Sequence, residues 1–217
     1  ELFLVKESEN IPISTARFAN VAFSDGSLLH GFDQRIQKKQ PIVAPYDVKR
    51  YFITPEESGL LCLFSCILGD NKDIFFPKLK EELHLITFSE IAANYLKNRG
   101  LSPYICDTEE EARMSARSIL KNRQWPCLFT ASDTTGEKDF EEFYTDQETL
   151  DMDKFEDLGI VKQSLDFNNE ELNKFLNEIE KFKNRGQWSK EELLKLFQMV
   201  IPSFNHLDKG KYLDSKM

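Results

Sequence analysis

Three short stretches of this chain carry residue types that bind a phosphorylated ligand. They are residues 16–21 (Ala-Arg-Phe-Ala-Asn-Val) running into 25–27 (Asp-Gly-Ser), residues 49–57 (Lys-Arg-Tyr-Phe-Ile-Thr-Pro-Glu-Glu) and residues 135–138 (Thr-Gly-Glu-Lys). A diphosphate is bound by backbone N–H groups at a helix N-terminus together with guanidinium or ammonium groups. Since the three stretches supply both kinds of donor, we expect an anionic ligand held among their loops.

The first stretch predicts a strand that leads into a Gly-Ser loop and then a helix. Gly26 permits a positive φ, and Ser27 opens a helix whose first amides lack intrahelical acceptors, although such an entrance often serves only as a cap. Asn20 ends the predicted strand, and open α/β sheets bind ligands outside the carboxyl ends of their strands. The same asparagine serves equally well as the cap of a turn.

The second and third stretches offer the cations. Arg50 suits bidentate pairing with phosphate oxygens, and the alternative is a surface arginine paired with Asp47 or Glu56. Glu137 and Lys138 place an acid and a base beside a glycine turn, a combination that also occurs often by chance.

The overall charge restricts the class of partner. The 217 residues carry a formal charge of −9 with a sequence pI near 5.0, whereas nucleic acids and anionic membranes bind concentrated basic surfaces. We therefore expect no nucleic acid and no membrane as partner. The longest apolar run, residues 60–68, is far shorter than the roughly 20 residues that span a bilayer, and Glu1 does not open a signal peptide, so a soluble protein is expected.

Cysteine and histidine spacing argues against a metal. The four cysteines and three histidines form no Cys-x-x-Cys pair and no His-x-x-His pair, so we expect no metal site. The thiols are expected to be reduced and packed, as in a cytosolic protein. They belong to Cys62, Cys66, Cys106 and Cys127.

Hydrophobic periodicity and cap signatures predict the elements that position these residues. Residues 1–6 read as the end of a helix, residues 11–21 as a buried strand, and a helix is expected to begin after Ser27. Thr54 predicts another helix start, because Pro55 and a capping-box glutamate follow it. The same Thr/Ser-x-x-Glu signature marks residues 87–90, 108–111 and 189–192.

Short strands are expected between these helices, at residues 42–44, 73–76, 104–106 and 127–131. Strand and helix alternate over residues 41–107, which is the pattern of an α/β domain. Beyond Gly159, apolar stripes at residues 172–182 and 193–201 predict a helical tail. Both stripes are ordinary core faces or, as the alternative, a partner-binding helix pair.

The chain lacks the motifs of a self-sufficient catalyst. It has no Gly-x-Gly-x-x-Gly fingerprint, no Tyr-x-x-x-Lys, no Gly-x-Ser-x-Gly and no recognisable Cys–His pair. No catalytic residue is therefore assigned, and the chain is expected to be inactive by itself.

Four segments occur in the order and with the residues of a known enzyme family. Residues 16–21 with 26–27 are similar to Val-Arg-[Tyr/Phe]-Gly-Asn-Val…Gly-Ser, and residues 50–57 to Arg-Phe-[Phe/Trp]-[Met/Ile]-Thr-x-x-Glu. Residues 73–78 resemble Glu-Ile-Phe-Val-x-Lys, and residues 134–142 resemble Arg-Pro-Gly-Glu-Lys-x-x-Glu-Glu. These motifs belong to the UDP-N-acetylglucosamine 4,6-dehydratases of polysaccharide biosynthesis, in the extended short-chain dehydrogenase/reductase superfamily.

The resemblance implies an NAD(P)-dependent lyase that oxidises C4 of the sugar, eliminates water across C5 and C6, and returns the hydride at C6. In that family a Tyr-x-x-x-Lys helix precedes the strand that corresponds to residues 13–21. The chain therefore resembles the substrate-binding half, and NAD or NADP is expected to be bound mainly by the N-terminal half of a longer protein. The implied ligand is a UDP-sugar, and the complete protein is expected to be a cytoplasmic homo-oligomer.

Site roles follow from the resemblance by position. Asn20 would contact the diphosphate or sugar, Arg50 the diphosphate, and Glu137 the ribose. The chain has Thr134-Thr135 where the family has Arg-Pro, which removes one cation from this loop. Lys138 is the residue that would compensate.

The resemblance also implies which residues form the uracil pocket. Ser27 and Leu28 would line its pocket, and Ile42, with its neighbours Pro41 and Val43, would form the second wall.

The expected fold is α/β: the last helix and strand of a Rossmann-like sheet (residues 1–24), a small mixed α/β domain that binds the nucleotide-sugar substrate (25–159) and a helical C-terminal tail (160–217). Two alternatives to the dehydratase stay open. One is a UDP-sugar 4-epimerase of the same superfamily, against which the Gly-Glu-Lys loop argues. The other is a non-catalytic nucleotide-sugar-binding or assembly protein.

Overall fold

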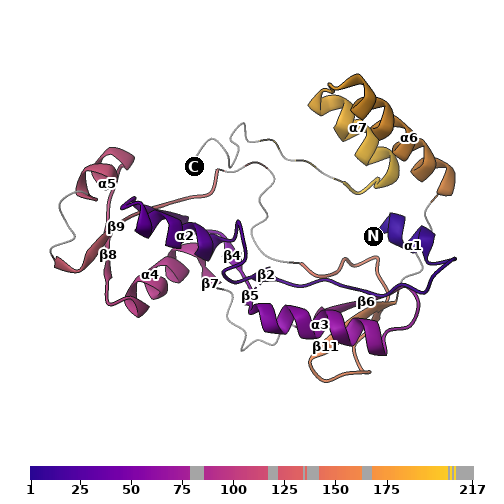
Figure 1. Ribbon diagram of the computed structural model, residues 1–217, viewed down its shortest axis with the longest axis horizontal. Coiled ribbons are helices and arrows are strands. Elements are labelled where there is room, and N and C mark those ends of the chain that lie inside the picture. Colours follow the sequence, from indigo (N-terminus) through magenta and orange to yellow (C-terminus); the bar gives the residue numbers. More distant parts are fainter. Residues whose placement is uncertain are drawn as a thin grey trace.

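The computed structural model of the protein (Figure 1) describes residues 1–78, 86–116, 122–133, 135, 142–162, 168–204, 206 and 208. Within them the architecture is mixed α/β, with several small sheets and a pair of helices toward the C-terminus. None of the described helices combines the length and the apolar character that crossing a bilayer requires.

A parallel three-stranded sheet and its helices form the part of the molecule at the left of Figure 1. The strands follow the order β3 (Ile42–Pro45), β9 (Gln124–Thr130), β8 (Ser102–Ile105). The helices packed on them are α2 (Leu28–Gln37), α4 (Phe88–Asn98) and α5 (Glu109–Ser115). Their apolar faces enclose a core around Phe32, Leu96 and Trp125. The three strands expected here are thus confirmed, with ends shifted by a few residues.

A four-stranded mixed sheet lies at the lower right of Figure 1 and is called the mixed sheet below. Its order is β1 (Thr15–Ala16), β6 (Asp73–Pro77), β11 (Leu158–Lys162), β10 (Leu150–Asp151). Strands β1 and β6 are parallel, and the other pairs are antiparallel. Helix α3 (Pro55–Leu68) packs on β1 and β6, where Leu61 meets Phe75 and Ile160.

Helix α1 (Leu2–Glu7), where the sequence predicted a helix over residues 1–6, lies on the other face of the β1–β6 pair. Its Val5 and Leu4 line a small hollow together with Thr15 and Ile74. Successive side chains of a strand point to opposite faces, so Ile74 faces away from Phe75, which is the residue that contacts α3.

Two short ladders connect the two sheets. Strand β2 (Asn20–Val21) pairs in parallel with β5 (Phe52–Ile53). Strand β4 (Lys49–Arg50) pairs antiparallel with β7 (Ile86–Thr87). Because β4 and β5 are separated by one residue, these ladders bring the end of the first motif beside the second.

The four helix starts predicted from Thr/Ser-x-x-Glu are confirmed. At Thr54, Thr87 and Ser189, the hydroxyl accepts a hydrogen bond from the N3 amide, and the N3 glutamate accepts one from the cap's own N–H. At Thr108 the hydroxyl also caps the helix, but the carboxylate of Glu111 accepts from the N–H of the preceding residue.

The expected buried strand over residues 11–21 is wrong as a single element. The chain leaves the mixed sheet after Ala16 and pairs with β5 only from Asn20 onward. Ile11 is 67% exposed and Phe18 is 40% exposed. The change of partner strand between the two sheets breaks the alternation that the apolar residues suggested.

The helical tail consists of α6 (Asn169–Arg185) and α7 (Lys190–Val200), which pack on each other at the upper right of Figure 1. Gly186 ends α6 with a φ of 73°. Phe175 and Phe197 bring the two helices into contact, with ring centroids 5.4 Å apart. The side chain of Lys6 on α1 donates to Asn173 at 2.7 Å and so connects the pair to the rest.

All four cysteines are free thiols. Cys106 and Cys127 are buried between β8 and β9, as expected. Cys62 and Cys66 are exposed on α3, so the expectation that every cysteine is packed is wrong for this helix. The apolar sequence of α3 suggested burial, but only one side of the helix is covered.

Candidate functional site

Asn20 lies at the junction of the first and second stretches. Its backbone N–H donates to the carbonyl of Tyr51 at 3.2 Å, and its side-chain amide donates to the same oxygen at 3.4 Å. In the parallel ladder Asn20 is opposite Phe52. Strand pairing therefore fixes an exposed carboxamide next to the segment that contains the motif arginine.

Arg50 is held on β4 one residue before that carbonyl. Its Nη1 donates to the carbonyl of Lys49 at 2.8 Å, and its guanidinium lies 5.8 Å from the centroid of the Phe88 ring. The Phe88 ring also contacts that of Phe52, with centroids 6.4 Å apart. A guanidinium within about 6 Å of an aromatic face gains a cation–π attraction, which restricts where this partly exposed cation points.

Ser27 and Leu28 begin α2, on the loop that leaves β2. Gly26 has a φ of +75°, a conformation that glycine adopts without strain. The Ser27 hydroxyl accepts from the N–H of His30 at 3.3 Å, so the predicted N-cap is confirmed. The Leu28 side chain is partly buried against the core of the parallel sheet. Contact of either residue with a uracil stays a prediction.

Ile42, unlike the site residues above, is fully buried. It begins β3 and is 0% exposed in the core beside Ala44 and Cys127. Its neighbour Val43 is 37% exposed on the other face of the strand. Of the pair, Val43 is therefore the side chain that solvent reaches.

The third stretch contributes Thr135 alone to the described part of the chain, and both Glu137 and Lys138 lie outside it. The described residues on either side of them contact the first two stretches or a residue just before the second. The N–H of Ser132 donates to both carboxylate oxygens of Asp47, at 2.8 and 3.1 Å. Phe143 is buried in the cluster that contains Ala19, with Tyr51 packed against it.

Arg17 is a residue of the first motif to which the sequence assigned no role. It reaches three segments: its guanidinium forms two bonds to Glu1 at 2.8 and 2.6 Å and two to Glu148 at 3.0 and 2.7 Å. A fifth bond, of 2.8 Å, runs from Nη1 to the carbonyl of Phe143. All five N–H donors of the guanidinium are thus engaged. The only signal in the sequence was its place in the first motif, three residues before Asn20.

The charged groups around Arg17 shift one another's pKa values. Hydrogen bonding to Arg17 lowers the pKa of Glu1 below its usual range. Burial raises the pKa of Glu148, but hydrogen bonds from Arg17 and Thr145 outweigh burial, and the net shift is downward. The same contacts raise the pKa of the guanidinium, so Arg17 stays charged at every physiological pH.

The polar groups at this junction are of the kinds that bind an anion. The arrangement places the Asn20 carboxamide, the Arg50 guanidinium and the N-terminus of α2 at the ends of β2 and β4. The described residues also contain no cluster of three or more His, Cys, Asp or Glu side chains that would hold a metal ion.

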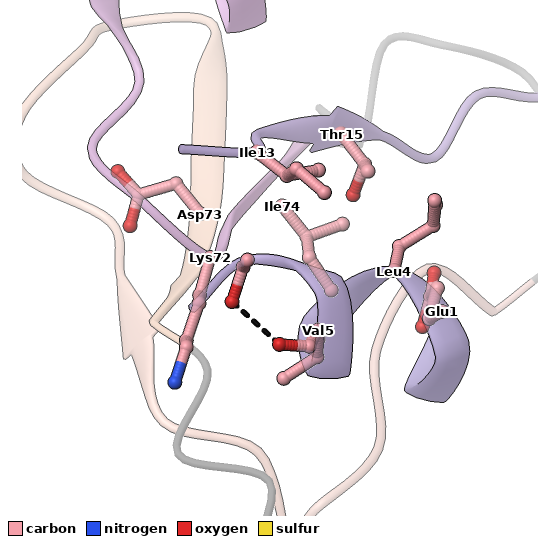
Figure 2. A pocket seen from close by; sticks show the side chains of 9 residues that line it. Glu1, Leu4, Val5, Ile13, Thr15, Lys72, Asp73 and Ile74 are labelled. Atoms are coloured by element: carbon pink, nitrogen blue, oxygen red, sulfur yellow. Dashed lines mark hydrogen bonds between the residues drawn. The ribbon is translucent and has the colours of Figure 1, made fainter. Parts of the chain in front are cut away.

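The small hollow between α1 and β1 is a separate feature (Figure 2). Figure 2 shows Leu4 and Val5 of α1 facing Ile13, Thr15 and Ile74. None of the predicted site residues lines it. Its apolar lining is that of a packing defect between a helix and a sheet.

The known proteins that are similar to this chain include the following two. An uncharacterized membrane protein of Methanocaldococcus jannaschii is 26% identical over 163 residues, which cover 73% of this chain and 42% of that protein. The X-ray structure of Pen from Bacillus thuringiensis has a TM-score of 0.50 at 19% identity, covering 70% of this chain and 40% of Pen. The second likeness is one of fold, and the chain spans about two fifths of the length of each relative.

The matched family covers all four motifs. A model of the polysaccharide biosynthesis protein family matches residues 3–163, which include both sheets and end before the helical pair. This match is continuous across the stretches that meet at Asn20 and Tyr51. The chain belongs to the polysaccharide biosynthesis protein family.

Proposed function

We propose that this chain is the substrate-binding portion of a nucleotide-sugar 4,6-dehydratase that acts on a UDP-N-acetylhexosamine, with UDP-N-acetylglucosamine as the preferred substrate. One observation carries the proposal: Asn20 bonds to the carbonyl of Tyr51, beside Arg50. Two motifs that are some thirty residues apart in sequence therefore meet, and the proposed carboxamide and guanidinium contacts come from residues at this junction. Family membership and the order of the four motifs support the choice of a sugar nucleotide.

Each contact with the nucleotide has a proposed residue. Arg50 pairs with the diphosphate, and Asn20 with the diphosphate or the sugar. The start of α2, at Ser27 and Leu28, faces the uracil, because the first amides of a helix are ready donors and a leucine offers an apolar surface.

The proposal extends to three more residues. Glu137 meets the ribose, and Lys138 supplies the cation that Thr134-Thr135 lack. The strand that carries Ile42 borders the uracil, with Val43 as the side chain that reaches solvent.

The residues of this chain do not fit a bound NAD or NADP. A dinucleotide needs a glycine-rich turn between strand and helix, and the sequence contains no Gly-x-Gly-x-x-Gly. At Gly26, the described glycine turn nearest to a helix start, the hydroxyl of Ser27 caps the helix. We therefore assign the redox cofactor to another part of a longer protein and derive no hydride step from this chain.

The test is an assay of the longest polypeptide that the gene encodes. It is incubated with NAD or NADP and a panel of UDP-hexosamines, and the products are identified by mass spectrometry. We expect a product lighter by one water molecule, formed fastest from UDP-N-acetylglucosamine.

The other outcomes separate the alternatives. A product of unchanged mass with inverted C4 would identify a 4-epimerase. Binding of UDP-sugars without turnover would identify a non-catalytic binding protein, and the absence of both binding and turnover would reject the site itself.

A further inference from the structure

The chain beyond α7 folds back along that helix. The ring centroid of Phe204 lies 5.5 Å from that of Phe197, which is about two turns into α7 and also contacts Phe175 of α6. Further along the tail, the carboxylate of Asp208 accepts a hydrogen bond from the ammonium of Lys190, the first residue of α7. The helical pair therefore holds the Asp208 carboxylate beside the start of α7.

The same carboxylate is bonded to the third stretch. Its Oδ1 accepts from the hydroxyl of Thr135 at 3.2 Å, whereas its Oδ2 accepts from Lys190. A hydroxyl and an ammonium, brought together from distant parts of the chain, thus hold one anion. Donors of this kind also bind phosphate oxygens, and a carboxylate offers the same acceptor chemistry as a phosphate. Asp208 is therefore an internal anion on a pair of anion-binding groups.

The contact begins at the same edge of the parallel sheet as the proposed diphosphate site. Strands β3 and β9 are parallel neighbours, and just past their carboxyl ends the N–H of Ser132 donates to the carboxylate of Asp47. Arg50 follows Asp47 by three residues, and Thr135 follows Ser132 by three. Open α/β sheets bind their ligands outside the carboxyl ends of the strands. Arg50 and Thr135 therefore both extend from the edge at which a ligand is expected.

The ion pair on this edge is exposed to solvent. The side chain of Lys190 is 34% exposed, and that of Asp208 is 44% exposed. Exposed ion pairs contribute little to stability, because water and salt screen them. A phosphate group carries more negative charge than a carboxylate and has more acceptor oxygens. A phosphorylated ligand can therefore compete with Asp208 for the two donors.

We propose that the hydroxyl of Thr135 and the ammonium of Lys190 form a further phosphate subsite of the nucleotide-sugar site, and that the carboxylate of Asp208 occupies it until a phosphate displaces it. The docked tail thus lowers the affinity of the site, and α7 supplies a cation once the carboxylate leaves. Lys190 lies beyond residues 3–163, which the family model matches. The inference rests on the proposed function, because it adds a contact to the same ligand.

Asp208→Asn tests the displacement in the longest polypeptide that the gene encodes. If the carboxylate occupies the donors for about one half to nine tenths of the time, its removal should lower the dissociation constants of UDP and pyrophosphate about 2- to 10-fold. The dissociation constant of uridine, which has no phosphate, should stay the same. Isothermal titration calorimetry measures all three. A gain in affinity is not what the loss of a merely structural contact would produce.

Glu178→Gln is the matched control for the change in net charge. Glu178 pairs with Lys181 at 2.6 Å within α6, so this variant removes one negative charge from the same helical pair at an ion pair contained in one helix. It should leave all three dissociation constants unchanged. An equal gain from Glu178→Gln and Asp208→Asn would show that net charge alone sets the affinity, and it would overturn the inference.

A second substitution tests the cation. In the Asp208→Asn background, Lys190→Gln should cancel the gain for UDP and pyrophosphate, because the ammonium that the phosphate takes over is gone. Lys181→Gln in the same background should keep the gain. If the gain survives Lys190→Gln, Lys190 is not part of a phosphate subsite.

The choice of ligands separates this inference from the proposed function. Equal binding of UDP to the unmodified chain and to Asp208→Asn would reject the subsite and leave the proposed function intact. If neither protein binds UDP, the proposed function fails, and pyrophosphate decides the subsite by itself. Tighter binding of pyrophosphate to Asp208→Asn would then support the subsite, whereas equal or absent binding would reject it.

Discussion

Asn20 is bonded twice to one backbone oxygen of Tyr51, through its main-chain N–H at 3.2 Å and its carboxamide at 3.4 Å. The pair joins a strand near the N-terminus to the residue between β4 and β5. Because Arg50 directly precedes Tyr51, the two bonds also hold the backbone of Arg50 next to β2. The pairing therefore joins the first two motifs in the structure.

Arg50→Ala should weaken the binding of UDP. A hydrogen bond to a charged group contributes about 1.5 to 3 kcal/mol, so the dissociation constant should rise by roughly 10- to 150-fold. Isothermal titration calorimetry with UDP measures the change directly.

The control for this prediction is Arg113→Ala. Arg113 is an exposed arginine that pairs with Glu109 one turn away on α5. Equal dissociation constants for the two variants would identify Arg50 as a surface arginine with no role in the site.

Arg17→Gln should destabilise the fold and change its response to acid. Removing one partner of a buried ion pair costs about 3 to 5 kcal/mol, and we expect about 2 to 4 because Arg17 and Glu1 retain some exposure. The pKa values of Glu1 and Glu148 are lowered in the folded state, so their contribution is present above about pH 4.5 and is lost as the pH falls through the folded values.

Melting temperatures recorded from about pH 7 down to about pH 3 test both effects. The unmodified chain should lose stability steeply below about pH 4.5, and Arg17→Gln should start lower and fall less. Parallel curves for the two proteins would show that other carboxylates control the acid response.

The helix starts could be predicted from the sequence because their physics is local. At Thr54 and Ser189, the cap and its glutamate are three residues apart and satisfy each other without help from the rest of the chain. The short strands at residues 42–44 and 73–76 could also be predicted, from their β-branched and aromatic residues. Each of these elements can be predicted without knowing what it packs against.

The other features of the fold and the site depend on residues that are distant in the sequence. Whether residues 11–21 form one strand is decided by β6 and β5, whose paired residues follow some thirty to sixty positions later. Arg17 meets Phe143 and Glu148, which no spacing rule connects to it. The predicted neighbourhood of Asn20 and Arg50 rested on a family resemblance, because neither residue type implies the other.

Thr54→Ala should remove the cap of α3 and weaken the packing of that helix on β1 and β6. The Thr54 hydroxyl accepts from the N–H of Glu57 at 3.1 Å, and the Glu57 carboxylate accepts from the N–H of Thr54 at 2.6 Å. Loss of such a cap costs about 1 kcal/mol. Urea unfolding should show this loss for alanine and little change for Thr54→Ser, which keeps the acceptor. A full loss with serine would assign the effect to the methyl group instead.

Alanine substitutions at two glycines should change the free energy of unfolding in opposite directions. A Cβ on Gly159 would lie 2.3 Å from Cζ of Phe76, its partner across the β11–β6 ladder, and Phe76 is only 1% exposed. Overpacking of this kind costs about 1 to 3 kcal/mol. Gly31 lies inside α2 and a Cβ there would meet nothing within 4 Å, so alanine should stabilise the helix by about 0.5 to 1 kcal/mol.

A third variant tests whether the Phe76 ring, or the backbone of strand β11 itself, excludes a side chain at residue 159. If the Phe76 ring is the obstacle, Gly159→Ala should cost less in a Phe76→Leu background than alone, because leucine vacates the space that the Cβ needs. A thermodynamic cycle from urea unfolding of the four proteins gives this coupling. Strictly additive costs would mean that the strand backbone, and not the ring, excludes a side chain at residue 159, and the close approach at Gly159↔Phe76 would then have no energetic consequence.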